Sequence, residues 1–254
     1  MSLAGIDFGL LGPAFVAGLL VTATHVPLGI QVLSRGIVFI DLAIAQVAGL
    51  GVIFADALGL EHHGWGVQAA ALASALAGAL LLTWTERRWP QVQEAVIGTV
   101  FILAASGALL LLAANPHGAE HLKELLVGQI LWVNWSSLPL VALVSASILA
   151  LWFGMRERLG RTGFYILFAA AVTVSVQLVG IYLVFTTLIV PALATHWMRE
   201  ARLAVCYALG ACGYGLGLVV SAALDLPSGA VIVWALALLA TPLLVFGARS
   251  VPER

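Results

Sequence analysis

The chain has 254 residues, of which 62% are hydrophobic and only 9% are charged, and its formal net charge is −1. Ordinary soluble domains carry roughly 25% charged residues, so a chain this poor in charge could not cover its surface in water. The composition therefore excludes an ordinary soluble domain and indicates a protein whose solvent is the core of a lipid bilayer.

Apolar runs follow one another along the whole chain, and most have the length of a membrane-spanning helix, which takes about 20 residues. The run 163–198 is too long for one straight pass, and it contains Gly180 near its middle and Pro191 near its end. We therefore predict an all-α transmembrane bundle of 8–9 spans, a single transmembrane domain over residues 1–254, with 163–198 broken near Gly180 and Pro191. The runs cover residues 9–33, 36–58, 67–84, 93–114, 136–154, 163–198, 203–224 and 229–247.

The cationic side chains predict the orientation of these spans. Ten of the eleven gather in five clusters, and the clusters alternate with cation-poor segments. The positive-inside rule places the clusters in the cytoplasm. Nine crossings result if 163–198 crosses twice, with the C-terminus cytoplasmic; eight result if the first run does not cross. The clusters are Arg35; Arg87 and Arg88; Arg156, Arg158 and Arg161; Arg199 and Arg202; and Arg249 and Arg254.

Three polar side chains fall within the first two predicted spans. Counting helical rise from Arg35 puts Asp41 roughly 9 Å and Gln46 roughly 17 Å into the second span, with His25 roughly 15 Å deep on the preceding helix. Ionisable groups at such depth are costly and are therefore candidates for function. A carboxylate and an imidazole form a partial ligand shell for a divalent transition metal.

Structural alternatives stay open for all three residues. Asp41 also fits a hydrogen-bonded carboxylate near the cytoplasmic edge, and His25 also fits a packed histidine beside the kink at Pro27. Gln46 equally fits an interhelical hydrogen-bond partner.

The outer loops hold four of the six histidines, beside several glutamates. His117 and His121 are four residues apart, so they share a face if their segment is helical. Imidazole with carboxylate suits zinc, manganese or iron, which predicts a metal-collecting outer vestibule. Solvated loop histidines are the alternative. The vestibule candidates are His62, His63, His117 and His121.

Small residues in the run 203–224 predict close packing. Gly210, Gly213 and Gly217 lie three and four apart, and such a stripe allows close helix contact, either within one bundle or between subunits. Cys206 and Cys212 are six apart and face different directions. We expect no disulfide or metal pair there, and expect both cysteines to be small buried residues.

Several motifs are absent from the sequence. It has no Gly-x4-Gly-Lys-Ser/Thr phosphate loop, and Lys123 is its only lysine, so the chain cannot bind and hydrolyse ATP in that manner by itself. It also has no His-Glu-x2-His or Gly-x-Ser-x-Gly motif, which disfavours an intramembrane hydrolase. Basic tracts with interleaved aromatic residues, which would indicate nucleic-acid binding, are missing as well.

Three segments occur in series along the chain. In the first, residues 35–51, Arg35 precedes a helix with Asp41. The second combines Glu94-Ala-Val-Ile-Gly98 with Gly128-Gln-Ile-Leu131, and the third runs from Val179-Gly180 to Leu188-Ile-Val-Pro191-Ala-Leu-Ala194. Together they resemble the permease subunits of the metal-ion ABC transporter family, which takes up zinc, manganese or iron.

The resemblance implies a multi-pass subunit of the cytoplasmic (inner) membrane that forms a homodimer in lipid. It also implies two cytoplasmic ATPase subunits and an extracytoplasmic metal-binding protein as partners. The transported divalent metal ion would be cargo, with no permanently bound cofactor. In the family, the metal passes an aspartate and a histidine four residues later. Asp41 matches that aspartate, but the second position is Ala45, so His25 is our candidate substitute.

The segment that would contact the ATPase also departs from the family pattern. The family has a cytoplasmic Phe-Asp-x3-Ala-x3-Gly segment, whereas this chain has the shorter Arg156-Glu-Arg-Leu-Gly-Arg161-Thr-Gly163, which lacks the aspartate. We expect a compact turn there, with Arg156, Glu157, Arg158 and Arg161 as coupling residues. The predicted function is import of a divalent metal ion; the alternative is a secondary transporter driven by an ion gradient.

Overall fold

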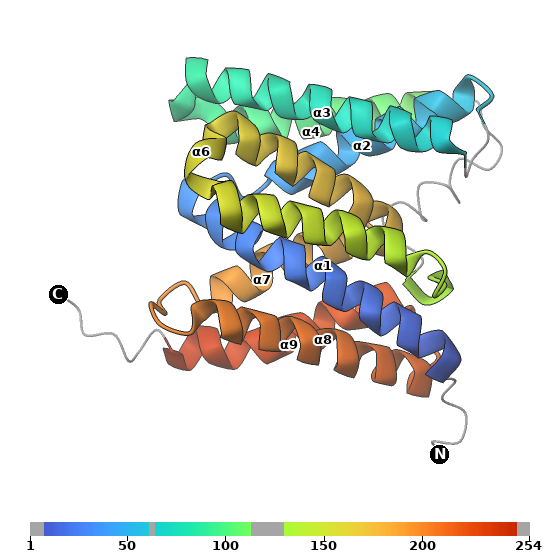
Figure 1. Ribbon diagram of the computed structural model, residues 1–254, viewed down its shortest axis with the longest axis vertical. Helices are drawn as coiled ribbons and strands as arrows, with labels where there is room; N and C mark the ends of the chain where they lie inside the picture. The colour runs from blue at the N-terminus through green and yellow to red at the C-terminus, as the bar shows by residue number, and fades with distance from the viewer. Residues whose placement is uncertain (1–7, 61–63, 113–129, 248–254) are drawn as a thin grey trace. The chain divides into compact units, whose positions relative to one another are not determined.

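The computed structural model describes residues 8–60, 64–112 and 130–247, and within these ranges all regular structure is helical. The predicted all-α fold is therefore confirmed (Figure 1). The α-helices are α1 (Phe8–Arg35), α2 (Ile40–Ala57), α3 (Trp65–Arg88), α4 (Gln93–Leu112), α6 (Leu138–Val179), α7 (Ile181–Ala194), α8 (Arg202–Leu224) and α9 (Ser228–Gly247), and the 3-10 helices are η2 (Pro90–Val92) and η3 (Ile130–Trp132).

Eight helical segments among the described residues are long and apolar enough to span a membrane, which agrees with the predicted 8–9 spans. Two of them, Leu138–Met155 and Arg158–Val179, belong to α6. The helix α7 has 14 residues and is therefore about 21 Å long, shorter than the ~30 Å core of a bilayer.

The predicted break at Gly180 is confirmed, because Gly180 separates α6 from α7 with a φ of 84°, a conformation that favours glycine. Pro191 lies inside α7, which ends three residues later at Ala194.

The helices separate into two compact units. Unit 1 contains α1, the beginning of α6 up to Leu149, α7, α8 and α9. Unit 2 contains α2, α3, α4 and the part of α6 from Ala150 to Gln177.

In unit 1, α1 and α8 run antiparallel and in close contact. A Cβ atom added to Gly18 would collide with the ring of Tyr214, and one added to Gly210 would collide with Thr22. Going from Gly18 to Thr22 along α1, the contacted residue of α8 changes from Tyr214 back to Gly210, so the two helices run in opposite directions. The Arg35 end of α1 therefore lies at the same end of unit 1 as the start of α8.

The glycine stripe of α8 packs within this unit. Gly213 and Gly217 face Leu236 and Ile232 of α9, so these two helices also run antiparallel. Of the two roles predicted for the stripe, close packing within one bundle is therefore the one that these contacts support. The end of α9 therefore lies beside the start of α8, at the arginine-bearing end of unit 1.

The two cysteines of α8 differ in their surroundings. Both are free thiols, as expected. Cys206 is buried, with its Sγ 3.0 Å from Thr195 Oγ1 and donating to the Pro191 carbonyl over 3.3 Å. Cys212 is exposed, so the expectation that both are buried was wrong for this residue. Six residues turn an α-helix by roughly 240°, which places it away from the packed side of α8.

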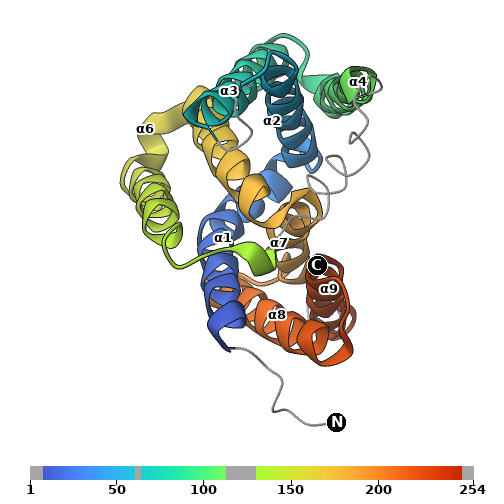
Figure 2. The same ribbon diagram turned by 90° about the vertical axis from the view of Figure 1, so that its right-hand side faces the viewer.

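In unit 2, α2, α3 and α4 lie side by side (Figure 2). The Phe39 N–H donates to Glu94 Oε1 over 3.3 Å, which brings the starts of α2 and α4 together. The helix α2 lies between α3 and α4, and α3 runs antiparallel to it, because Gly51 faces Ser74 and Gly78 faces Val47. The three helices therefore alternate in direction, as successive membrane crossings must.

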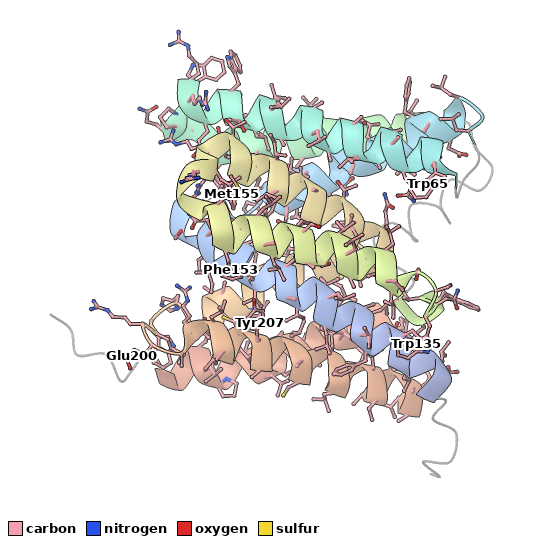
Figure 3. All side chains as sticks on the ribbon, viewed as in Figure 1. Trp65, Trp135, Phe153, Met155, Glu200 and Tyr207 are labelled. Atoms are coloured by element: carbon pink, nitrogen blue, oxygen red, sulfur yellow. The ribbon has the colours of Figure 1, made fainter. Side chains whose placement is uncertain are left out.

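Tryptophan side chains mark both ends of α3. Trp65 is exposed at its start, where Figure 3 labels it, and Trp84 and Trp89 are exposed at its other end. The rings of that pair meet edge to face with centroids 5.3 Å apart. Exposed tryptophans at both ends of an apolar helix are typical of the two membrane–water interfaces.

The helix α6 changes direction at Gly160, whose φ of 56° and ψ of −157° interrupt the helical geometry. The rings of Trp152 and Phe164 meet across this turn with centroids 5.8 Å apart. Arg87 Nη2 donates to Thr162 Oγ1 over 2.7 Å, so the end of α3 lies against the turn. Two of the arginine clusters, around Arg87 and around the turn, therefore lie at the same end of unit 2.

This arrangement predicts a specific cross-link. After both native cysteines are replaced by serine, the pair Arg87→Cys and Thr162→Cys should be joined by a short bifunctional thiol reagent, because the parent side chains are in contact. The measurement is the mobility of the chain after cleavage at a protease site introduced between the two positions. The control pair, Trp65→Cys with Thr162→Cys, combines opposite ends of α3 and should remain unlinked; linkage of the control alone would contradict the fold.

Candidate functional site

Asp41 is the second residue of α2, and its side chain is only 1% exposed. Its Oδ1 atom has no hydrogen-bond partner among the described residues. An unsatisfied buried acceptor costs about 1–3 kcal/mol, and more when it is charged. The carboxylate therefore occupies surroundings in which a positively charged ligand would be strongly favoured.

The predicted depth of Asp41 needs correction, because the helical count from Arg35 does not hold. The helix α1 ends at Arg35, Gly36 has a φ of 69°, and α2 begins only at Ile40. Asp41 therefore lies in the first turn of its helix, and Gln46 lies about 9 Å from the helix start.

The face of α2 that carries Asp41 offers no second ligand in the next turn. Ala45, one turn further along, is buried and has no donor atom in its side chain. Gln46 is 8% exposed, but five residues from Asp41 it points roughly 140° away around the helix. A cation held at Asp41 would need further ligands from other elements or from water.

His25, in the middle of α1, is fully buried. Its Nδ1 lies 3.1 Å from the Val21 carbonyl and 3.0 Å from Thr24 Oγ1. A carbonyl can only accept, so the ring nitrogen in this bond carries the hydrogen, and in the neutral ring Nε2 keeps its lone pair. Nε2 has no partner among the described residues. Metal-binding histidines commonly have this arrangement, with one nitrogen donating to a carbonyl and the other free.

The candidate ligands belong to different parts of the chain. His25 lies in unit 1, whereas Asp41 and Gln46 lie in unit 2. In the part of the chain that the structure describes, no group of three or more His, Cys, Asp or Glu side chains is arranged to hold a metal ion. The vestibule candidates His62, His63, His117 and His121 lie outside the described residues, and their role stays a prediction.

The predicted coupling segment forms a turn centred on Gly160. Arg158 and Arg161 are exposed on either side of it. Arg156 and Glu157 belong to the helical backbone that precedes the turn, and their side chains lie outside the described part. The expected compact turn is therefore present, and its exposed guanidinium groups are available to a protein partner.

The structure adds two polar residues to which the sequence analysis gave no role, Gln93 and Glu94 at the start of α4. Gln93 is 4% exposed and links α3 to α6, whereas Glu94 contacts the start of α2. An acidic residue in the first turn of an apolar span, soon after Pro90, was the signal that could have drawn attention to this position.

Comparison with known proteins agrees with this architecture. The model of the ABC 3 transport family matches residues 7–164 and 150–247. An uncharacterized membrane protein of Synechocystis is 27% identical over 90% of this chain and 87% of its own length.

Two solved structures share the fold. PsaBC from Streptococcus pneumoniae, solved in complex with Fab, superposes with a TM-score of 0.72 and 22% identity, covering 95% of this chain and 92% of that chain. A chain described as belonging to a metal-chelate type ABC transporter, in an inward-facing conformation, gives a TM-score of 0.66 and 15% identity, covering 98% of this chain and 90% of that chain.

The apolar helices, the broken region at Gly180 and the buried ionisable groups define a multi-pass membrane protein of the transport class. Because the family model accounts for nearly the whole chain, the protein belongs to the ABC 3 transport family. It is accordingly the permease subunit of an ABC transporter, a subunit that is not itself catalytic.

Proposed function

We propose that this permease moves a divalent transition-metal ion, zinc, manganese or iron, across the cytoplasmic membrane and into the cell. The observation that carries the proposal is the state of Asp41, which is the one carboxylate among the buried side chains of the described residues and whose Oδ1 has no partner among them. Such a group is costly in a membrane protein and marks an ion pathway by default.

The available donor atoms favour this class of cargo. A carboxylate oxygen and a neutral imidazole nitrogen together suit zinc, manganese and iron, whereas calcium and magnesium take oxygen ligands. Asp41 and His25 act as ligands at two positions along the path, and Gln46 supplies a weaker carbonyl ligand. The metal-chelate type of one structural relative agrees with a metal-containing cargo. The ion is cargo, so no permanently bound cofactor is required.

The arginine-bearing ends of the two units face the cytoplasm in this proposal, following the positive-inside rule. The C-terminus is then cytoplasmic. ATP is hydrolysed on separate ATPase subunits, which contact the turn at Gly160 through Arg156, Glu157, Arg158 and Arg161. The permease works as a homodimer in the lipid bilayer and receives metal from an extracytoplasmic binding protein.

The proposal is tested by reconstituting the permease with its ATPase subunits in vesicles, supplying the extracytoplasmic metal-binding protein, and measuring zinc, manganese and iron uptake by mass spectrometry. We expect uptake of at least one of these metals that requires ATP hydrolysis and stops with a non-hydrolysable analogue. Uptake driven by an imposed proton or sodium gradient without ATP would instead favour a secondary transporter. Absence of uptake of all three metals, with ATP hydrolysis intact, would overturn the choice of cargo.

His25 gives a separate prediction. Replacing His25 with alanine removes the free Nε2 lone pair, and we expect metal uptake to fall by roughly tenfold or more, as for loss of a metal-site group. The matched control is His196→Ala, because His196 is exposed and its Nδ1 bonds to the Leu193 carbonyl at the end of α7. Uptake at the parent level in both variants would remove His25 from the path.

A further inference from the structure

The start of α2 lacks a cap of its own. Phe39 is the N-cap residue, and its side chain, which has no polar atom, makes no cap hydrogen bond. The first N–H groups of any helix need an acceptor, and serine, threonine, aspartate or asparagine usually supplies one at the N-cap.

Glu94 of α4 supplies that acceptor. Its Oε1 receives the Phe39 N–H over 3.3 Å, although the two residues are 55 positions apart in sequence. A carboxylate beside a helix N-terminus is also favoured by the helix dipole. The other oxygen, Oε2, has no hydrogen-bond partner among the described residues, so the contact uses one oxygen only.

The residue before Glu94 fixes the start of α4. Gln93 Nε2 donates to the Leu82 carbonyl over 3.0 Å and lies 3.5 Å from the Tyr165 hydroxyl, while Gln93 Oε1 accepts from Thr85 Oγ1 over 3.0 Å. The start of α4 is thereby tied to the end of α3 and to α6. The backbone that carries Glu94 is therefore held in place by the bonds of Gln93. A residue that fixes the position of another helix needs such a support.

Asp41 follows Phe39 by two residues, so the direction of its side chain depends on the backbone of the first turn of α2. We propose that Glu94 is a positioning residue for Asp41: it caps α2 from a neighbouring helix and thereby fixes the carboxylate on which the proposed metal pathway depends. The inference rests on the proposed function for its effect on transport, but the cap itself can be tested without metal.

The cap is tested by hydrogen–deuterium exchange of the segment 37–42 in the assembled transporter in lipid nanodiscs. In Glu94→Ala we expect the exchange of this segment to accelerate about tenfold, whereas Glu94→Gln, which keeps a carbonyl acceptor, should stay near the parent. The matched control is Glu200→Ala, because Glu200 is exposed between α7 and α8 (Figure 3). Equal exchange in the parent and Glu94→Ala would overturn the inference.

The effect on transport is tested in the reconstituted system. We expect Glu94→Ala to raise the metal concentration for half-maximal uptake about tenfold with a smaller change in maximal rate, and Glu94→Gln to restore it. Recovery in Glu94→Gln separates positioning from a failure to fold.

Two results in this transport assay would overturn the inference. One is Glu94→Gln behaving like Glu94→Ala despite normal exchange; the other is faster exchange in Glu94→Ala with unchanged uptake. Failure of the proposed function has a different signature, because the parent itself would then move no metal.

Discussion

Replacing Asp41 with asparagine should reduce metal uptake to the level of vesicles that lack the permease. Asparagine has nearly the same size and keeps a carbonyl oxygen, so the variant removes the negative charge and little else. Because Asp41 is buried and its Oδ1 has no partner in the described part of the chain, that charge is the property that distinguishes this residue from its apolar neighbours. The measurement is ATP-dependent uptake of each metal by mass spectrometry.

The matched control is an aspartate whose side chain is exposed instead of buried. Asp225 is exposed after α8 with a φ of 51°, a conformation that asparagine adopts readily. Asp225→Asn should therefore leave uptake and stability unchanged. If Asp41→Asn transported metal like this control, the ion pathway would not involve Asp41 and the proposed function would lose its principal support.

The same substitution should not destabilise the protein. A buried carboxylate with an unsatisfied oxygen lowers stability, so its neutral replacement should leave the midpoint of thermal unfolding unchanged or raise it. A residue kept for folding behaves in the opposite way. Loss of uptake combined with equal or greater stability is the pattern of a group retained for function at a cost in stability. Unfolding can be followed by intrinsic tryptophan fluorescence in nanodiscs.

The helices of this protein were largely predictable from its sequence, because spanning a bilayer imposes long apolar runs. The positive φ that ends α6 was predictable at Gly180 for a local reason, namely that glycine adopts it without strain. The gathering of Arg87 with the turn at Gly160 was likewise anticipated by the alternation of charged clusters, and the bond from Arg87 to Thr162 supports it.

The site was less predictable, because it depends on where helices begin and on what lies beside them. The run 36–58 gave no sign that its first four residues form a turn, so Asp41 was placed too deep in its helix. The contact between Phe39 and Glu94 joins positions far apart in the chain, and no local pattern reveals it. The exposure of Cys212 depends on which side of α8 its neighbours occupy, which composition alone does not fix.

Replacing Gly29 with alanine should have the largest effect on stability. A Cβ atom at this position of α1 would collide with the Leu188 carbonyl oxygen of α7, and a backbone atom inside a helix cannot rotate away as a side-chain tip can. Overpacking of this kind usually costs about 1–3 kcal/mol. We expect a clear fall in the midpoint of thermal unfolding and a smaller yield of assembled transporter on size-exclusion chromatography.

Gly154→Ala is the control, because no atom lies within 4 Å of a Cβ atom added at Gly154 in α6. The stability of Gly154→Ala should equal or slightly exceed that of the parent, because alanine is roughly 1 kcal/mol more favourable than glycine inside a helix. Equal stability of the two variants would mean that α1 and α7 are further apart than the structure places them.

The hydrophobic effect does not favour contact between two membrane helices over contact with lipid, so their association depends on close approach of the backbones. Gly29 matters because it permits that approach in unit 1, within two turns of the Arg35 end of α1.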